Sequence, residues 1–359
     1  MNYDTPISPL LVRGGMQLPK KGLKRLLIRG TNWIGDAVMT LPALASIRKT
    51  WPDACIFMLA KPWVADIYRL CPHVDEIVVF ESPGRHDGII GKIRLAKDLQ
   101  KLRFDGAILL QNAIEAAIIA RLARIPFRAG FNSDGRGALL THAVKRTAEV
   151  RNIHQTRYYL EMVKALGAED VPVHVRIDPK LEDLSRIKPL ITQYGLEDRP
   201  LIGMAPGATY GAAKKWFPER FAAVADRLAD DFSAAILLFG SEADRESTAR
   251  IESHTRHSVI DLAGKTDLRQ AMALMARCRV FISNDSGLMH VAAALGVPTI
   301  AIFGSTNPIT TGPAGNRNII IRKDVPCSPC LKTDCPKDFQ CMNLISVDDV
   351  YEAARRLAG

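Results

Sequence analysis

The sequence predicts an α/β protein made of two doubly wound parallel sheets. Short apolar runs alternate with amphipathic stretches along the chain, which implies parallel strands joined by helices on both faces of a sheet. The alternation starts afresh near residues 178–200, where a polar segment, DPKLEDLSRIKPLITQYGLEDRP, separates the halves. A chain of 359 residues is also long enough for two cores of ordinary size.

In the first half, the expected strands are short runs rich in aliphatic side chains, and the expected helices show apolar residues at helical spacing. The strands are Leu26–Arg29, Cys55–Ala60, Glu76–Phe80, Gly106–Leu110 and Arg128–Phe131, and the helices include Ala37–Lys49, Ile89–Leu102 and Ala113–Ala123.

The second half repeats this scheme, and Pro218 suits the first turn of its first helix. The expected strands are Leu201–Ala205, Ala234–Phe239, Val259–Asp261, Val280–Ser283 and Thr299–Phe303, and the helices include Pro218–Ala229, Leu268–Arg277 and Ser286–Leu295.

Composition describes a globular chain with an anionic partner. Hydrophobic residues make up 47% and charged residues 24%, no apolar run reaches the ~20 residues of a membrane span, and the first 23 residues lack the apolar core of a secretory signal. We therefore expect a cytoplasmic protein. The net charge of +10 favours nucleic acid, anionic lipid or a phosphorylated substrate. Nucleic acid is disfavoured, because aromatics make up 6% and no nucleic-acid motif is visible.

A glycine loop, RGTNWIGDAVMTLPAL, follows the first strand and holds Gly30, Gly35 and Asp36. Such loops usually cradle phosphate, and the two glycines have the spacing that begins a P-loop. Asp36-Ala37 stands where a P-loop needs Lys-Ser/Thr, and neither half contains G-x-G-x-x-G. A P-loop ATPase and a dinucleotide enzyme are therefore disfavoured.

A second glycine loop, APGATYGAAKKWFPERF, suits a phosphate or diphosphate. Gly207 and Gly211 allow close backbone approach, and Lys214 and Lys215 supply cations. From spacing alone, a mobile surface loop with two solvated lysines is an equal alternative.

A third loop, Asn284-Asp285-Ser286-Gly287, joins a buried strand to an alanine-rich helix. The amides at the helix start attract an anion, and Asp285 can accept hydrogen bonds from sugar hydroxyls, although a simple helix cap is the alternative for Asp285 or Ser286. His290 suits a packed core position. After another strand, Glu242 is a candidate for ribose hydroxyls or for a first-turn helix acid.

Four of the seven cysteines cluster in CSPCLKTDCPKDFQC, at Cys327, Cys330, Cys335 and Cys341. In a cytosolic protein, C-x-x-C followed closely by two more cysteines favours a structural metal, with zinc as the first choice, over disulfides. Against this, the second pair lacks C-x-x-C spacing.

The motifs N-W-I-G-D-A-V-M, G-A-T-Y-G-A-A-K-K-W-F-P and N-D-S-G-L-M-H, in this order, resemble the ADP-heptose:lipopolysaccharide heptosyltransferases, glycosyltransferase family 9. The resemblance runs from about Leu26 to the end. The tryptophan and aspartate of the first motif, and the lysines of the second, are most like the group that adds the second heptose.

The resemblance implies a GT-B architecture of two Rossmann-like domains facing a cleft. It implies an extension at residues 1–23, an acceptor domain at 24–180, an ADP-sugar domain at 181–345 and a C-terminal helix at 346–359 that crosses back to the first domain.

It also implies an inverting transfer of heptose from ADP-heptose to the first inner-core heptose of a Kdo–lipid A precursor, with no required cofactor. The protein would lie at the anionic cytoplasmic face of the inner membrane, without a nucleic-acid partner. Asp36 would be the general base, beside an acceptor-side loop. The acceptor-side residues are Asn32, Trp33 and Gly35; the donor residues are Thr209, Lys214, Asp285, Ser286, Gly287 and Leu288, with Glu242 at the ribose or adenine.

Two alternatives stay open. One is a related transferase with another acceptor, of the first or third heptosyltransferase type, or with another nucleotide sugar. The other is a basic peripheral-membrane or nucleic-acid-binding protein whose cysteine cluster holds a metal.

Overall fold

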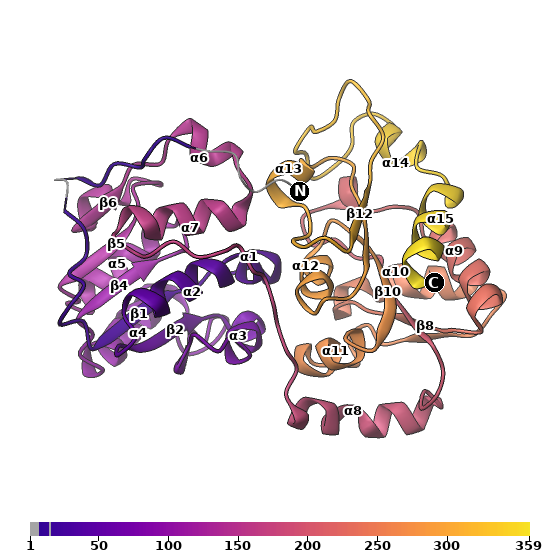
Figure 1. Cartoon of the computed structure of the whole chain (residues 1–359), viewed down its shortest axis with the longest axis horizontal. Coiled ribbons are helices and arrows are strands. Elements are labelled where there is room, and N and C mark those ends of the chain that lie inside the picture. Colours follow the sequence, from indigo (N-terminus) through magenta and orange to yellow (C-terminus); the bar gives the residue numbers. More distant parts are fainter. Residues whose placement is uncertain (1–6, 14–15) are drawn as a thin grey trace. The chain divides into compact units, whose positions relative to one another are not determined.

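A computed structural model describes residues 7–13 and 16–359, and the chain divides into two compact units (Figure 1). The first unit extends to Val175, and the second runs from Arg176 to Gly359. The sequence placed this boundary at residue 180. The observed boundary lies slightly earlier, at residue 175, because the connecting segment already contacts the second unit. The Ile177 amide donates to the Ala294 carbonyl of that unit over 2.9 Å.

The first unit is built on a six-stranded, fully parallel sheet with strand order β3-β2-β1-β4-β5-β6. Because the order reverses between β1 and β4, the helices that follow lie on both faces of the sheet. The strands are β1 (Arg25–Arg29), β2 (Cys55–Ala60), β3 (Glu76–Val79), β4 (Gly106–Leu109), β5 (Phe127–Phe131) and β6 (His142–Val144); the helices are α1 (Ile34–Met39), α2 (Leu41–Thr50), α3 (Pro62–Arg69), α4 (Gly88–Lys101), α5 (Ile114–Leu122), α6 (Ala148–Asn152) and α7 (Gln155–Ala165).

The second unit repeats the topology with strand order β12-β11-β10-β7-β8-β9, again all parallel. Its strands are β7 (Leu201–Ala205), β8 (Ala235–Leu238), β9 (Val259–Asp261), β10 (Cys278–Asn284), β11 (Thr299–Ile302) and β12 (Asn318–Ile321); its helices are α8 (Leu181–Tyr194), α9 (Pro218–Phe232), α10 (Arg245–His254), α11 (Leu268–Met275), α12 (Gly287–Ala294), α13 (Pro308–Thr311), α14 (Gln340–Asn343) and α15 (Val347–Ala358). The prediction of two doubly wound sheets is confirmed.

The reversal of strand order marks where each sheet can bind a ligand. In doubly wound sheets, ligands bind outside the carboxyl ends of the strands at this switch point. In the first unit this position is flanked by the loops after β1 and β4, and in the second unit by the loops after β7 and β10. The three glycine loops singled out in the sequence follow β1, β7 and β10, so all of them lie at switch points.

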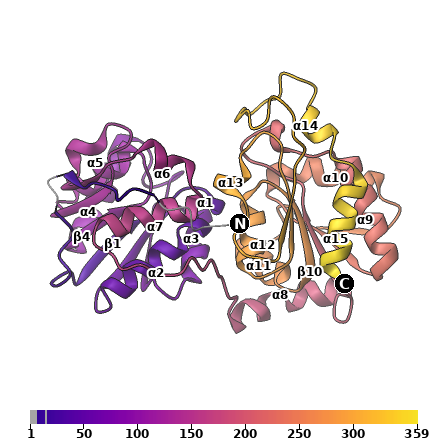
Figure 2. The ribbon, with the colours of Figure 1, turned by 45° about the horizontal axis from the view of Figure 1, so that its top comes forward.

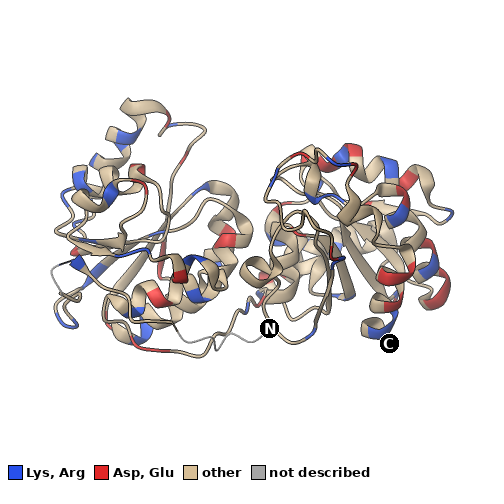
Figure 3. Cartoon of the chain, turned by 90° about the horizontal axis from the view of Figure 1, so that it is seen from above, with Lys and Arg blue, Asp and Glu red and all other residues tan. Residues whose placement is uncertain are grey.

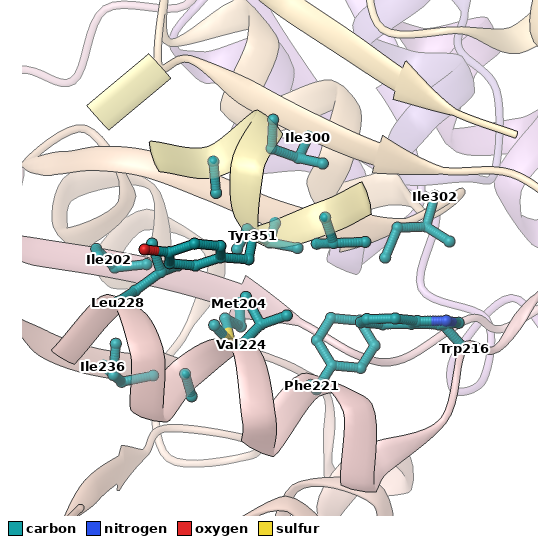
Figure 4. Close-up of a cluster of buried hydrophobic side chains, with 14 of the residues drawn as sticks. Ile202, Met204, Trp216, Phe221, Val224, Leu228, Ile236, Ile300, Ile302 and Tyr351 are labelled. Atoms are coloured by element: carbon teal, nitrogen blue, oxygen red, sulfur yellow. The ribbon is translucent and has the colours of Figure 1, made fainter. Parts of the chain in front are cut away.

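The C-terminal helix α15 corrects one expectation. It packs against α9 and along β10, β11 and β12, within the second unit (Figures 1 and 2). Its apolar face supplies Val350, Tyr351 and Ala354 to the core of that unit. In Figure 4, Tyr351 lies beside Leu228 of α9 and Ile202 of β7. The helix therefore completes its own sheet's core rather than crossing back to the first domain.

The single helix expected at residues 37–49 is two helices. Helix α1 starts earlier, at Ile34, and ends at Met39, and α2 begins at Leu41. Pro42 has no amide hydrogen and cannot continue the ladder of α1. Thr40 occupies the junction, where its hydroxyl donates to the Ala37 carbonyl over 2.6 Å.

The N-terminal extension lies along the first unit wherever it is described; residues 1–6 and 14–15 fall outside the described residues. Val12 forms an antiparallel bridge to Val144 of β6. The Leu18 amide donates to Leu166 over 2.9 Å, and the Leu18 side chain is buried. Within the described part of the chain, no helix combines the length and apolar character needed to cross a bilayer.

Candidate active site

The loop after β1 is shaped by close packing against α3. A side chain at Gly30 would come within 2.9 Å of the Tyr68 ring, so only glycine fits there without movement. The Tyr68 hydroxyl in turn lies 3.3 Å from the Thr31 amide and 3.4 Å from the Thr40 hydroxyl. Tyr68 therefore fixes the backbone on both sides of the segment that carries Asp36.

Arg29, the last residue of β1, is a buried cation beneath this loop. Its guanidinium donates to the Gly30 carbonyl over 2.5 Å and to the Asn32 side-chain oxygen over 2.7 Å. Burial lowers the pKa of Arg29 to about 10, so it stays charged at neutral pH. The Asn32 carbonyl accepts a further bond, 2.7 Å long, from the indole of Trp63. Asn32 is thus held at both its side chain and its backbone.

Asp36 is the third residue of α1 and is half-buried. The amides of the first turn and the helix dipole favour its negative charge. Burial, and next the charge of Asp36, raise the pKa of Tyr159 on α7 well above its ordinary value. The Tyr159 hydroxyl therefore stays neutral at ordinary pH. Gly35 is buried and Trp33 is 60% exposed, so the loop presents its tryptophan to the outside.

The same sheet edge holds cations that the sequence analysis did not single out. Lys61 follows β2, is buried, and donates to the Ser82 carbonyl over 2.8 Å, with its ammonium 3.9 Å from the Phe80 ring centre. Arg136 follows β5 and is fully buried. It donates to the carbonyls of Phe131, Gln111 and Leu109, and burial lowers its pKa to about 10. Lys61 could have been named from the sequence, because it is a basic residue directly after an apolar strand.

In the second unit, Asn284 joins two of the predicted loops. Its amide nitrogen donates to the Pro206 carbonyl over 2.6 Å, and its oxygen accepts from the Trp216 amide over 3.1 Å. Because Asn284 ends β10, the glycine loop after β7 is held at both ends against the loop after β10. The structure therefore brings these two loops together.

Lys214 and Asp285 meet directly. The Lys214 ammonium lies 2.6 Å from Asp285 Oδ2, and the Thr306 hydroxyl donates to the same oxygen over 2.6 Å. Both members of the ion pair are largely buried, with side-chain exposures of 14% and 5%. The Lys214 ammonium also lies 4.9 Å from the Tyr210 ring centre. Thr306 and Tyr210 are site residues that the sequence analysis did not identify.

The start of α12 supplies backbone amides beside Asp285. Ser286 is the N-cap, and its hydroxyl accepts from the Met289 amide over 3.4 Å. Gly287 and Leu288 form the first turn and are half-buried. Ser286 is therefore the cap that the sequence allowed, and a cap of this kind leaves the first-turn amides directed at an anion. His290 is buried, as predicted for a packed histidine.

The two remaining donor residues lie on the surface. Thr209 is exposed in the loop after β7. Glu242 pairs with Arg245 over 2.8 Å, and both are well exposed. It follows β8, the neighbour of β7, so it belongs to the same sheet edge as Lys214. The position of Glu242 is compatible with a contact to ribose hydroxyls and with an acid in the first turn of a helix.

The four clustered cysteines line one cavity of about 230 Å³, together with Ala213 and Ser305 among others. Cys335 accepts from the amides of Lys337 and Phe339 over 3.4 and 3.3 Å. Burial and the three neighbouring cysteines raise the pKa of Cys341. In the described ranges, no group of three or more His, Cys, Asp or Glu is arranged to hold a metal ion. The four thiols therefore line one cavity, and the zinc site stays a prediction.

Comparisons with known sequences agree on one family. The profile described as glycosyltransferase family 9 (heptosyltransferase) matches residues 92–340. Lipopolysaccharide heptosyltransferase 2 of Salmonella typhimurium is 33% identical over 83% of this chain and 88% of its own length. Lipooligosaccharide heptosyltransferase 2 of Haemophilus ducreyi is 32% identical over the same shares.

Solved structures give the same result. The structure of Escherichia coli ADP-heptose lps heptosyltransferase II matches with a TM-score of 0.79 and 27% identity, covering 93% of this chain and 98% of that one. A glycosyl transferase family 9 structure from Veillonella parvula matches with a TM-score of 0.86 and 26% identity, covering 96% and 98%.

Proposed function

The chain belongs to glycosyltransferase family 9, the heptosyltransferases, and we propose that it moves L-glycero-D-manno-heptose from ADP-heptose to the first inner-core heptose of a Kdo–lipid A precursor. The observation that carries the proposal is the similarity to proteins named heptosyltransferase 2, at 32–33% identity over 83% of the chain. We place the reaction in lipopolysaccharide core biosynthesis, at the cytoplasmic face of the inner membrane.

The donor half of the reaction belongs to the second unit in this proposal. An ammonium has three N–H donors, so Lys214 can keep its contact with Asp285 and also donate to the diphosphate. The first-turn amides of α12 add a second source of positive potential. Both stabilise the charge that develops on ADP as it leaves, which makes preorganised electrostatics the main contribution here. The proposal also assigns Thr209 to the diphosphate and Glu242 to the ribose or adenine.

The acceptor half belongs to the first unit. Asp36 takes the proton of the attacking hydroxyl, the oxygen bonds to the anomeric carbon from the face opposite the diphosphate, and the carbon–oxygen bond to ADP breaks. This sequence inverts the anomeric centre and needs no cofactor. A positioned base contributes roughly 10²–10⁴-fold to such a step. Asn32, Trp33 and Gly35 position the loop and border the acceptor.

The test is transfer from ADP-heptose to two defined acceptors, Kdo–lipid A with and without its first heptose. Transfer only to the heptose-bearing acceptor is expected. Transfer only to the heptose-lacking acceptor would assign the chain to the first heptosyltransferase type instead. If ADP-heptose is inert with both but another nucleotide sugar reacts, the donor assignment is wrong.

A further inference from the structure

Two neighbouring helices of the first unit, α4 and α5, carry large aliphatic side chains on the surface that points away from the sheet. Their inward positions, such as Leu95 and Ala117, are buried in the core of the unit. Their outward positions are not: Ile89 is 78% exposed and Ile90 is 74% exposed. We define the apolar face as the exposed residues Ile89, Ile90, Ile93, Ile114, Ile118 and Leu122.

The residues of the apolar face lie on two helices that are in contact with each other. Ile114, Ile118 and Leu122 follow one another at intervals of one helical turn along α5. The 2.5 Å ion pair between Lys92 of α4 and Glu115 of α5 joins the N-terminal halves of the two helices. Large exposed aliphatic side chains gathered on neighbouring helices favour an interaction site.

Three exposed cations border the apolar face, and one exposed acid, Asp87, lies at its start on α4. Arg94 and Lys97 of α4 are exposed and lie one turn beyond Ile90 and Ile93. Arg121 of α5 is also exposed and lies one turn beyond Ile118. Such a surface is complementary to lipid, whose acyl boundary accepts the aliphatic side chains while its phosphates attract the cations. A symmetric contact with a second copy would instead bring these like charges together.

We propose that the apolar face docks the protein on an anionic lipid bilayer. The isoleucines enter the boundary between headgroups and acyl chains, and Arg94, Lys97 and Arg121 contact lipid phosphates. The inference rests on exposure and charge in the first unit and does not depend on which sugar is transferred.

The place of the apolar face in the fold gives docking a functional consequence, which rests on the proposed function. In parallel sheets, each helix begins at the carboxyl edge where the preceding strand ends. Ile89 and Ile114 therefore lie at the starts of α4 and α5, on the same sheet edge as the loop that carries Asp36. Docking would bring this edge to the bilayer that anchors a lipid-linked acceptor.

The test is flotation of the full-length protein with vesicles of phosphatidylglycerol and phosphatidylethanolamine, without donor or acceptor. The triple variant Ile89→Ser/Ile93→Ser/Ile118→Ser should bind about tenfold or more weakly than the unaltered protein. The double variant Lys97→Gln/Arg121→Gln should bind about fivefold more weakly for each cation removed and lose part of its salt dependence. Purely zwitterionic vesicles should bind the unaltered protein poorly.

A matched control removes exposed apolar residues elsewhere: Leu181→Ser/Leu184→Ser/Ile309→Ser should leave vesicle binding unchanged. Unchanged thermal unfolding of every variant shows that the folds are intact. Binding of the isoleucine variant as tight as that of the unaltered protein overturns the proposal. The proposal is also overturned if the unaltered protein does not bind vesicles but forms a concentration-dependent dimer, and the isoleucine variant abolishes that dimer. Because no substrate is present, these outcomes are independent of the transfer assay.

Discussion

Asp36 stands where a P-loop would carry its lysine, and the structure shows what fixes the loop around it. Gly30 is required by the Tyr68 ring, and Asn32 is held by Arg29 and Trp63. These contacts fix the loop without using Asp36 as a cap, because the residue in the N-cap position of α1 is Trp33.

Asp36→Asn should reduce transfer by roughly 10²–10⁴-fold, because the amide cannot accept the hydroxyl proton. ADP binding by calorimetry and the thermal unfolding temperature should change little. Asp53→Asn, at an exposed residue of the same unit, is the matched control and should be fully active. Near-normal turnover combined with a much lower unfolding temperature would instead make Asp36 a purely structural residue.

Lys214→Ala should raise the KM for ADP-heptose more than it changes the KM for the acceptor, because the proposed function assigns this ammonium to the diphosphate of the donor. The variant should also unfold at lower temperature, because Asp285 would be left buried without its cation. Lys215→Ala changes a neighbouring lysine and serves as the control. Steady-state kinetics with each substrate varied in turn measure the effect, and unaltered donor kinetics would contradict the diphosphate role.

At the scale of helices and strands, the sequence predicted the fold well because apolar runs and helical spacing are local signals. Strands β7 and β9 have the expected bounds. The edge strands β6 and β12 were missed, and β6 is only three residues long. The break at Thr40 was also missed, although Pro42 was a readable signal.

The site was predicted less completely, for a physical reason. Glycines, acids and lysines in loops at strand ends are visible in the sequence, so Asp36, Lys214 and Asp285 could be named as candidates. Arg136 is held by carbonyls on β4 and β5, and Thr306 by a carboxylate on another loop. Such partners are distant in sequence, and no local pattern reveals them. The same limit applied to α15, whose partner surface depends on tertiary packing.

Tyr351→Ala tests the placement of α15. The ring packs in the core of the second unit, and the Arg227 guanidinium lies 3.6 Å from its centre. Loss of a buried aromatic side chain costs about 3–5 kcal/mol of unfolding free energy. Urea unfolding followed by fluorescence measures this loss. Repeating it with ADP, which in the proposed function binds the second unit, should show that the loss belongs to that unit. Glu352→Ala, exposed on the same helix, should have little effect; equal stability of both variants would contradict this packing.

The cysteine segment supports a separate prediction. If Cys327, Cys330, Cys335 and Cys341 bind zinc as thiolates, they must draw closer together than in this structure, because no metal-binding group is formed among the described residues. Protein purified without a His tag should then contain about one zinc per chain, and its removal by chelator should increase protease cleavage between residues 327 and 341. Cys278→Ser, at a buried cysteine of the same unit, should retain the metal. Absence of stoichiometric zinc or iron would rule the site out.

For the whole molecule, the excess of basic residues is spread widely. Figure 3 shows Lys and Arg on both units, interspersed with Asp and Glu. A net charge of +10 at pH 7 rises further as pH falls and carboxylates and histidines protonate, so self-repulsion destabilises the folded chain in acid. Any specific contribution of a histidine must be separated from this general effect by comparing variants at the same pH.

His86 should make a specific contribution to acid sensitivity. It is buried, and its Nδ1 accepts a hydrogen bond from the Glu81 amide over 3.0 Å. Burial lowers the pKa of His86 below its ordinary value. Nearby charges have smaller effects: Asp98 raises this pKa and Arg85 lowers it. The unfolded chain therefore binds the proton more readily than the folded chain. The resulting stability is full above the unfolded pKa of about 6.5 and is lost as pH falls from that value through the lower pKa of the folded state. His86→Gln keeps an acceptor for the Glu81 amide but cannot titrate. Its free energy of unfolding in urea should fall less between pH 7.5 and 5.5 than that of the unaltered protein, whereas His254→Gln, at an exposed histidine, should follow the unaltered protein. Identical pH dependence of all three proteins would show that His86 protonates equally in both states.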